Sequence, residues 1–398
     1  MTTLTSGTAG ARCVSFLRRA RKAAGLVLAA GVLAACQVAA PVAGDGGEGV
    51  RRSGPTQVAL LVPYGSARET DTQVARSLEN AARLAAADLG GAVEVNVYPT
   101  QGTASGAQTA TQQAIAAGAQ VVLGPLYADN AAAAGVAAST SGVPVLSFSN
   151  NISVAGGNVW VLGNTFDNVA QRLLTFAASQ GRNRVLVTHN DGQAGRIAAE
   201  AIARAAPGTG AQITGNIAYP LSQAGIQAAV PTIARQVGAT GSNAVFLTGN
   251  TAGDLPVIAQ LLTEAGVGGE QVRYLGLTRW DIPFDARTLP ALQGGYFTLP
   301  DPAPAQQFEA RYRGAYAAAP HPLAGLAYDG MAAIGAISRR GDTVGRTTLT
   351  APSGFAGVGG VFRLLPDGSI QRSLAVAQIV NRQIQVVSPA PNRFGPRS

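Results

Sequence analysis

The strongest constraint on the fold is an alternation of short apolar runs with segments of helical period, which begins at residue 57. Residues 58–62 read VALLV, a continuous apolar run typical of a strand buried on both faces of a sheet. Residues 72–87 then place apolar side chains on one helical face and Arg76, Glu79 and Arg83 on the other. The unit recurs in residues 93–98, 107–117, 121–126, 131–138 and 143–148. This order predicts right-handed βαβ units on a parallel sheet.

A second series of the same kind follows a short strand predicted at residues 159–162. It comprises helices at 168–178, 194–205, 226–237 and 255–265 and strands at 184–189, 212–219, 244–248 and 272–277. One sheet with so many strands would be unusually wide, so we expect two lobes. The chain closes with helices at 305–317 and 323–338 and strands at 360–365, 372–379 and 383–387, with tight turns at 366–368 and 381–382. A cleft lined by the carboxyl ends of parallel strands is where such lobes bind ligands.

The first 35 residues indicate an export signal. A basic segment precedes an apolar run at 23–35, which is shorter than the about 20 residues that span a bilayer. Leu33-Ala34-Ala35-Cys36 resembles the lipobox of bacterial lipoproteins, which implies cleavage after residue 35 and lipid on Cys36. Residues 36–55 are rich in Gly, Ala and Pro and predict a flexible tether. The alternative is that Cys36 merely ends a short apolar segment.

Composition excludes several chemistries. Loss of residues 1–35 would remove five of the 29 basic residues, leaving 24 against 21 acidic residues and a net charge of +3, so the basic total is no evidence for a nucleic-acid partner. Cys36 would be the one cysteine left, Lys22 is the one lysine, and His189 and His321 are the two histidines. Phosphate-loop, Schiff-base, thiol and His-rich zinc sites are therefore not expected. We expect no cofactor, no metal and no enzymatic activity.

Several segments together resemble the type I periplasmic binding-protein fold, in the leucine/isoleucine/valine-binding family. They are residues 59–63, 122–126, 143–147 and 327–331, with a closing Gly-x-Phe pattern at 360–368. The resemblance implies an α/β fold of two Rossmann-like parallel-sheet lobes joined by hinge crossovers. Lobe 1 is then expected at residues 56–165 and 298–348, lobe 2 at 166–297 and 349–388, and a C-terminal tail at 389–398.

A narrower resemblance is to the penicillin-binding protein activator family. It is carried by the lipobox and by residues 124–126, 147–151 and 372–376, although Ala194-Gly195 stands where family members often have Tyr-Gly. The resemblance implies a non-enzymatic lipoprotein that regulates a peptidoglycan synthase, its penicillin-binding protein partner. Gln37 after the cysteine favours the periplasmic face of the outer membrane, with inner-membrane anchoring as the alternative. The alternative function is a receptor for amino-acid or other small polar solutes that serves a permease.

Four candidate ligand-binding side chains follow the strand predicted at 143–148. Ser147, Ser149, Asn150 and Asn151 offer hydroxyl and amide groups, and in amino-acid-binding relatives this loop holds the carboxylate of the ligand. The alternative is ordinary turn chemistry, in which Ser and Asn side chains bond their own backbone.

Four further candidates lie at strand ends or in a family motif. Thr165 faces the ligand or caps the following helix, and Asp191 binds a ligand amine or is an exposed loop carboxylate. Asn250 ends a strand, with Asp254 expected to cap the next helix. Tyr328 belongs to a motif whose tyrosine borders the cleft in relatives, although helix packing explains it equally. Asp191 and Asp254 are the one carboxylate pair considered for a hydrolase.

Overall fold

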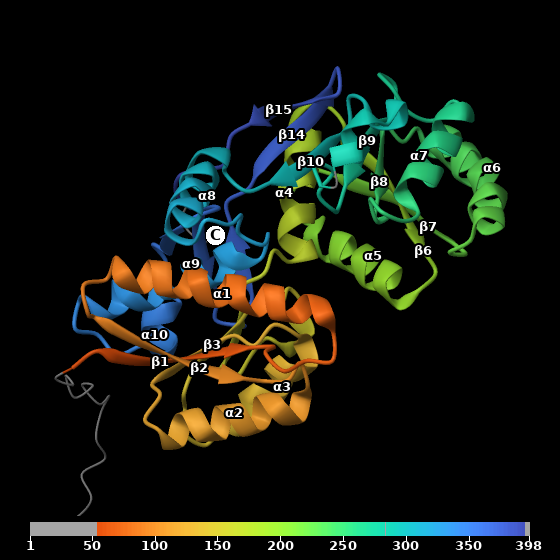
Figure 1. Ribbon diagram of the computed structural model, residues 1–398. Coiled ribbons are helices and arrows are strands. Elements are labelled where there is room, and N and C mark those ends of the chain that lie inside the picture. Colours follow the sequence, from red (N-terminus) through yellow and green to blue (C-terminus); the bar gives the residue numbers. More distant parts are fainter. Residues whose placement is uncertain (1–53, 283, 395–398) are drawn as a thin grey trace, which may run out of the picture. The chain divides into compact units, whose positions relative to one another are not determined.

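Three separate sheets organise the chain in the computed structural model, which describes residues 54–282 and 284–394. Their strand orders are β2-β1-β3-β4-β5, β15-β14-β10-β9-β8-β6-β7 and β11-β12-β13 (Figure 1). The expectation of more than one sheet is thereby confirmed. The predicted signal segment, Cys36 and the tether up to residue 53 lie outside the described residues. Within the described part of the chain, no helix has the length and apolar character needed to cross a membrane.

The first sheet is parallel throughout. Its strands are β1 (Thr56–Val62), β2 (Val93–Pro99), β3 (Val121–Leu123), β4 (Val145–Ser147) and β5 (Val159–Val161). Alternate residues of β1 point to opposite faces, so that Leu60 joins the core under α1 (Glu69–Ala87) and α9 (Ala324–Ser338) while Leu61 joins the core under α2 (Ala104–Ala116) and α3 (Ala128–Ala138). Helix α8 (Pro302–Tyr316) also contributes to the first of these cores.

The second sheet is mixed. Its parallel strands are β6 (Arg184–Asn190), β7 (Gln212–Tyr219), β8 (Ala244–Leu247), β9 (Arg273–Gly276) and β10 (Tyr296–Leu299), and β14 (Ala375–Val380) and β15 (Gln383–Ser388) add an antiparallel hairpin. Helices α4 (Phe166–Ser179) and α5 (Gln193–Ala205) share one core with the sheet, and α6 (Gln223–Thr240) and α7 (Leu255–Glu264) share the other. Asn381 and Arg382, both with positive φ, form the two-residue turn expected between β14 and β15.

The third sheet corrects the expected boundary between the lobes. Its strands are β11 (Phe355–Gly357), β12 (Gly360–Leu364) and β13 (Ile370–Arg372), all within residues 349–388 that we expected in lobe 2. The side chains of Phe355, Phe362, Leu364 and Ile370 instead complete the core shared with β1 and α9. The expected strand at 372–379 is interrupted at residues 373–374. We therefore call the first and third sheets with their helices the first lobe, and the second sheet with its helices the second lobe.

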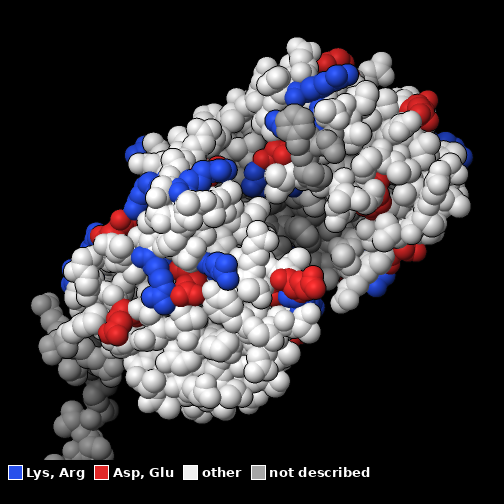
Figure 2. Space-filling view, viewed as in Figure 1, with Lys and Arg blue, Asp and Glu red and all other residues white. Residues whose placement is uncertain are grey.

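The chain passes between the lobes at three crossovers. The first joins β5 to α4, the second joins β10 to α8, and the third joins β13 to β14. Strand β10 was not expected from the sequence, because its four residues, YFTL, are too few to display a period. Figure 2 shows the charged side chains of one face in small groups of both signs on a largely uncharged surface, in keeping with 13% charged residues in the sequence.

Candidate functional site

The loop after β4 is fastened to the loop after β3 by Ser147. The Ser147 hydroxyl donates to the carbonyl oxygen of Pro125 over 2.9 Å and accepts from the backbone N–H of Ser149 at 3.1 Å. Ser147 is fully buried. Its side chain therefore positions the loop from within.

Of residues 149–151, Ser149 and Asn151 form hydrogen bonds within a turn, and Asn150 is exposed. Ser149 Oγ accepts from the N–H of Asn151 at 3.1 Å, and Asn151 Oδ1 accepts from the N–H of Ser153 at 2.9 Å. These are the local side-chain-to-backbone bonds that Ser and Asn form in turns. Asn150 between them is exposed. The loop thus presents the Asn150 amide, and the Ser149 hydroxyl keeps its proton for donation.

A second cluster at the same edge of the first sheet was not expected from the sequence. Tyr127, after β3, donates its hydroxyl to Asp71 Oδ1 over 2.5 Å, and the guanidinium of Arg68 lies 4.8 Å from the centre of the Tyr127 ring. Burial, followed by the hydrogen bond to Asp71, raises the pKa of Tyr127. Tyr127 directly follows the Gly-Pro-Leu segment, so a polar aromatic residue just after a buried strand was the available signal.

In the second lobe, Asp254 joins the carboxyl ends of three strands. Its Oδ1 accepts from the N–H of Asn250 at 2.7 Å, and its Oδ2 accepts from the hydroxyl of Tyr219 at 2.8 Å and from Asn190 Nδ2 at 3.4 Å. The expected side-chain cap of α7 by Asp254 is wrong, because its carboxylate accepts from these three donors instead. Burial, then the charge and hydrogen bond of Asp254, raises the pKa of Tyr219 far above its usual range.

Three side chains remain accessible at the carboxyl ends of the second sheet. Asp191, after β6, is exposed, and so is Asn250, whose Oδ1 accepts from the N–H of Ala252 in a tight turn. Arg279, after β9, is 37% exposed and pairs with Asp281, its Nε lying 2.9 Å from Asp281 Oδ1. Arg279 was missed in the sequence, although a charged residue three positions after a buried strand was the available signal.

Thr165 lies at the beginning of a helix, whereas Tyr328 lies beside the ion pair of Arg311 and Asp88. Thr165 is the N-cap of α4, where its Oγ1 accepts from the N–H of Asn168 at 3.2 Å. The Tyr328 hydroxyl donates to Asp88 Oδ2 over 2.8 Å and accepts from Arg311 Nη1 at 2.9 Å. Asp88 follows the far end of α1, a helix of 19 residues and hence about 28 Å in length, which begins at the carboxyl end of β1. The structure therefore does not bring Tyr328 to the carboxyl ends of the strands.

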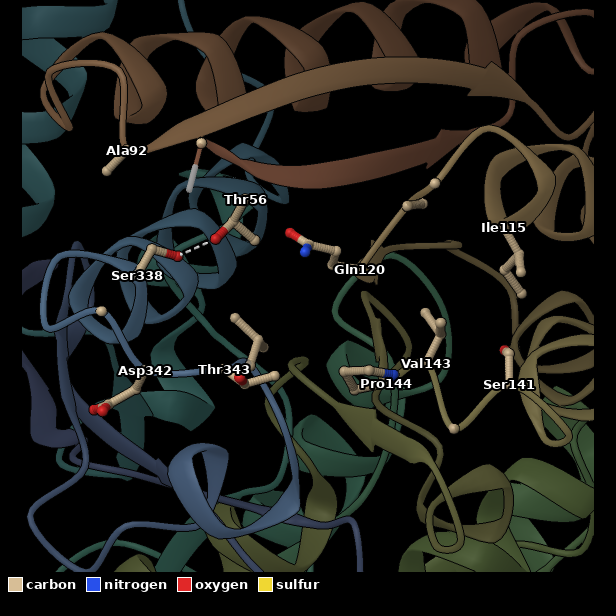
Figure 3. A pocket seen from close by; sticks show the side chains of 16 residues that line it. Thr56, Ala92, Ile115, Gln120, Ser141, Val143, Pro144, Ser338, Asp342 and Thr343 are labelled. Atoms are coloured by element: carbon tan, nitrogen blue, oxygen red, sulfur yellow. Dashed lines mark hydrogen bonds between the residues drawn. The ribbon is translucent and has the colours of Figure 1, made fainter. Parts of the chain in front are cut away.

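Two larger cavities lie away from most of the predicted residues. One of about 660 Å³ is lined by residues at the amino ends of first-lobe strands, including Thr56, whose hydroxyl lies 2.8 Å from that of Ser338 (Figure 3). The other, of about 1030 Å³, has walls from both lobes and includes Thr165, Asn168 and Phe394. Among residues 54–282 and 284–394, no group of three or more His, Cys, Asp or Glu side chains is placed to hold a metal ion.

Comparisons with known proteins agree with this architecture. Residues 55–383 match the sequence profile of the family described as Periplasmic binding protein. A chain from Rhodospirillum rubrum assigned to branched-chain amino acid ABC transport is 19% identical, with a TM-score of 0.69 over 84% of this chain and 100% of that one. A comparison with curated protein sequences gives no match.

Two further structures are similar. The leucine-binding protein of Thermotoga maritima is 18% identical, with a TM-score of 0.57 over 84% of this chain and 98% of that one. A solute-binding protein of an ABC transporter from R. palustris, solved with benzoate, is 16% identical, with a TM-score of 0.55 over 86% and 98%. These similarities show the expected fold, and the family implies a periplasmic location. The chain is therefore a member of the periplasmic binding protein family.

Proposed function

We propose that this protein is a periplasmic solute-binding protein that captures a small carboxylate, either an amino acid or another organic acid. The observation that carries the proposal is the placement of accessible polar side chains within three residues of the carboxyl ends of parallel strands in both lobes. Asn150 follows β4 in the first lobe, and Asp191, Asn250 and Arg279 follow strands of the second. The carboxyl ends of strands in open α/β sheets are where such folds bind ligands.

The chemistry of these groups favours a carboxylate. Asn150 Nδ2 and the Ser149 hydroxyl are neutral donors, and Arg279 offers a planar guanidinium suited to bidentate binding of a carboxylate. Asp281 already holds Arg279 in place, so a ligand carboxylate would share or take over that guanidinium. Asp191 is an acceptor for an ammonium group, which an amino acid carries and a simple acid lacks. The named ligands of two similar structures, leucine and benzoate, are both carboxylates and support this class.

Calorimetric titration of the purified protein with leucine, benzoate and a peptidoglycan-derived peptide tests the proposal. We expect one of the carboxylates to bind, and Arg279→Met to weaken that binding roughly 10- to 100-fold, the effect of losing hydrogen bonds to a charged group. Tyr328→Phe is the matched control and should leave the affinity unchanged. Wild-type protein that binds no member of the panel would count against a receptor.

A second candidate function is regulation of a peptidoglycan synthase by an outer-membrane lipoprotein anchored through Cys36. One observation favours it: Ser147 and Asn151 use their side chains in the loop itself, which leaves fewer groups for a solute. Reconstituted glycan polymerisation separates the two functions. A regulator changes the rate of the synthase without any added solute, whereas a receptor leaves it unchanged.

We also infer that the protein is not an enzyme. Asp254, one half of the carboxylate pair considered for hydrolysis, accepts hydrogen bonds from Asn190, Tyr219 and Asn250. Any hydrolase activity of the wild-type protein that disappeared in both Asp191→Asn and Asp254→Asn would contradict this inference.

A further inference from the structure

We propose that residues 389–394, here called the C-terminal strap, form a fourth link between the two lobes and restrain their relative rotation. The strap continues from β15 of the second sheet, and Figure 1 shows the chain leaving that strand toward the first lobe. Each of the three crossovers joins the lobes through the covalent backbone. The strap is covalently continuous with β15, but only non-covalent contacts attach it to the first lobe, and these can break while both lobes stay folded.

The strap is anchored to the second lobe by Arg172 of α4. The Nε of Arg172 donates to the carbonyl oxygen of Leu374 over 2.7 Å, and its Nη2 donates to Ser388 Oγ over 2.7 Å and to the carbonyl oxygen of Pro389 over 3.2 Å. One guanidinium thus joins the third crossover to the beginning of the strap.

Two further contacts connect the strap to the third crossover and to the first lobe. The hydroxyl of Ser373, a buried residue of the third crossover, donates to the carbonyl oxygen of Pro391 over 2.6 Å. At the end of the strap, the guanidinium of Arg363 lies 4.7 Å from the centre of the Phe394 ring. Arg363 is a buried residue of β12, in the third sheet. The strap therefore touches the second lobe, a crossover and the first lobe in that order.

The sequence of the strap suits this role. Pro389 and Pro391 restrict the backbone to extended conformations, so less conformational entropy is lost when the strap docks. Phe394 also lines the cavity of about 1030 Å³ whose walls come from both lobes. Opening or closing of the lobes changes the distance between Arg172 and Arg363, and the strap opposes that change. In a solute receptor, which rests on the proposed function, this restraint sets how readily the lobes close.

Hydrogen exchange of the solute-free protein tests the strap. We compare wild type with Phe394→Ala and with a chain ending at Ser388, and follow backbone amides of residues 162–168 and 372–375. Loss of one cation–π contact at a partly exposed ring should speed their exchange about two- to fivefold, and truncation should speed it further. Arg393→Ala, which changes an exposed residue of the strap, is the control and should match wild type.

Two results would overturn the proposal. One is unchanged exchange at the crossovers in both variants, which would show that the strap restrains nothing. The other is equal acceleration across all strands in Phe394→Ala, which would show a general loss of stability in place of a local restraint. The exchange measurements contain no solute. Their result therefore does not depend on whether the protein binds one.

Discussion

Arg372 and Asp329 form a buried ion pair beside the crossovers. Arg372 Nη1 donates to Asp329 Oδ2 over 2.6 Å, and both side chains are more than nine-tenths buried. Arg372 Nε and Nη2 also donate to the carbonyl oxygen of Leu162, at 2.9 and 2.8 Å. Burial raises the pKa of Asp329, and the charge of Arg372 acts against that rise. The pair thus joins α9 to the first and third crossovers.

Arg372→Met should destabilise the protein strongly. The substitution leaves Asp329 as a buried carboxylate without its cation, and breaking such a pair costs about 3–5 kcal/mol of unfolding free energy. Urea denaturation measures the loss. The control is Arg311→Met, which removes an ion pair with Asp88 that is 40% and 42% exposed and should cost less than about 1 kcal/mol. Equal losses in the two variants would contradict this account.

Asp88 should make stability depend on acid pH. Partial burial acts to raise its pKa, but hydrogen bonds from Arg311 and Tyr328 outweigh that effect and lower the pKa. A lowered folded-state pKa adds stability above the unfolded value of about 3.9, and that stability is lost as the pH falls through the folded-state pKa. Asp88→Asn lacks this contribution. The difference in unfolding free energy between wild type and Asp88→Asn should therefore be constant from pH 5 to 7 and shrink below about pH 4.

Asp254→Ala should cost about 1–3 kcal/mol of unfolding free energy, because it leaves the buried hydroxyl of Tyr219 and the N–H of Asn250 without their acceptor. Denaturant melts measure this loss. Asp191→Ala, at the end of the neighbouring strand and exposed, should stay within about 0.5 kcal/mol of wild type. A larger loss at Asp191 than at Asp254 would reverse our assignment of the structural and accessible carboxylates.

Cys36→Ser should release the protein from the membrane fraction, because lipid on Cys36 is the predicted anchor. Fractionation of cells and labelling with a fatty-acid analogue measure the change. Cys13→Ser, within the predicted signal segment, should leave both readouts as in wild type. Wild-type protein recovered unlabelled from the soluble fraction would rule out the anchor.

Local sequence determined the elements whose pattern is complete within a few residues. The apolar run 58–62 predicted a fully buried strand, the helical period of 72–87 predicted most of α1, and the two residues at 381–382 marked a hairpin turn. Each of these depends on side-chain period or on backbone conformation of adjacent residues, which the order of amino acids displays directly.

The tertiary structure decided which lobe a segment joins and what each polar side chain does. The sequence predicted a strand at residues 360–365, but only packing of Phe355 and Phe362 in the core shared with α9 and β1 assigns this segment to the first lobe. Asp254 was expected to cap a helix and instead bonds Tyr219, 35 residues away, and Arg372 finds its acceptor at Leu162, 210 residues away. A polar group is satisfied by whichever donor or acceptor the fold brings near, and separation along the chain carries no information on that choice.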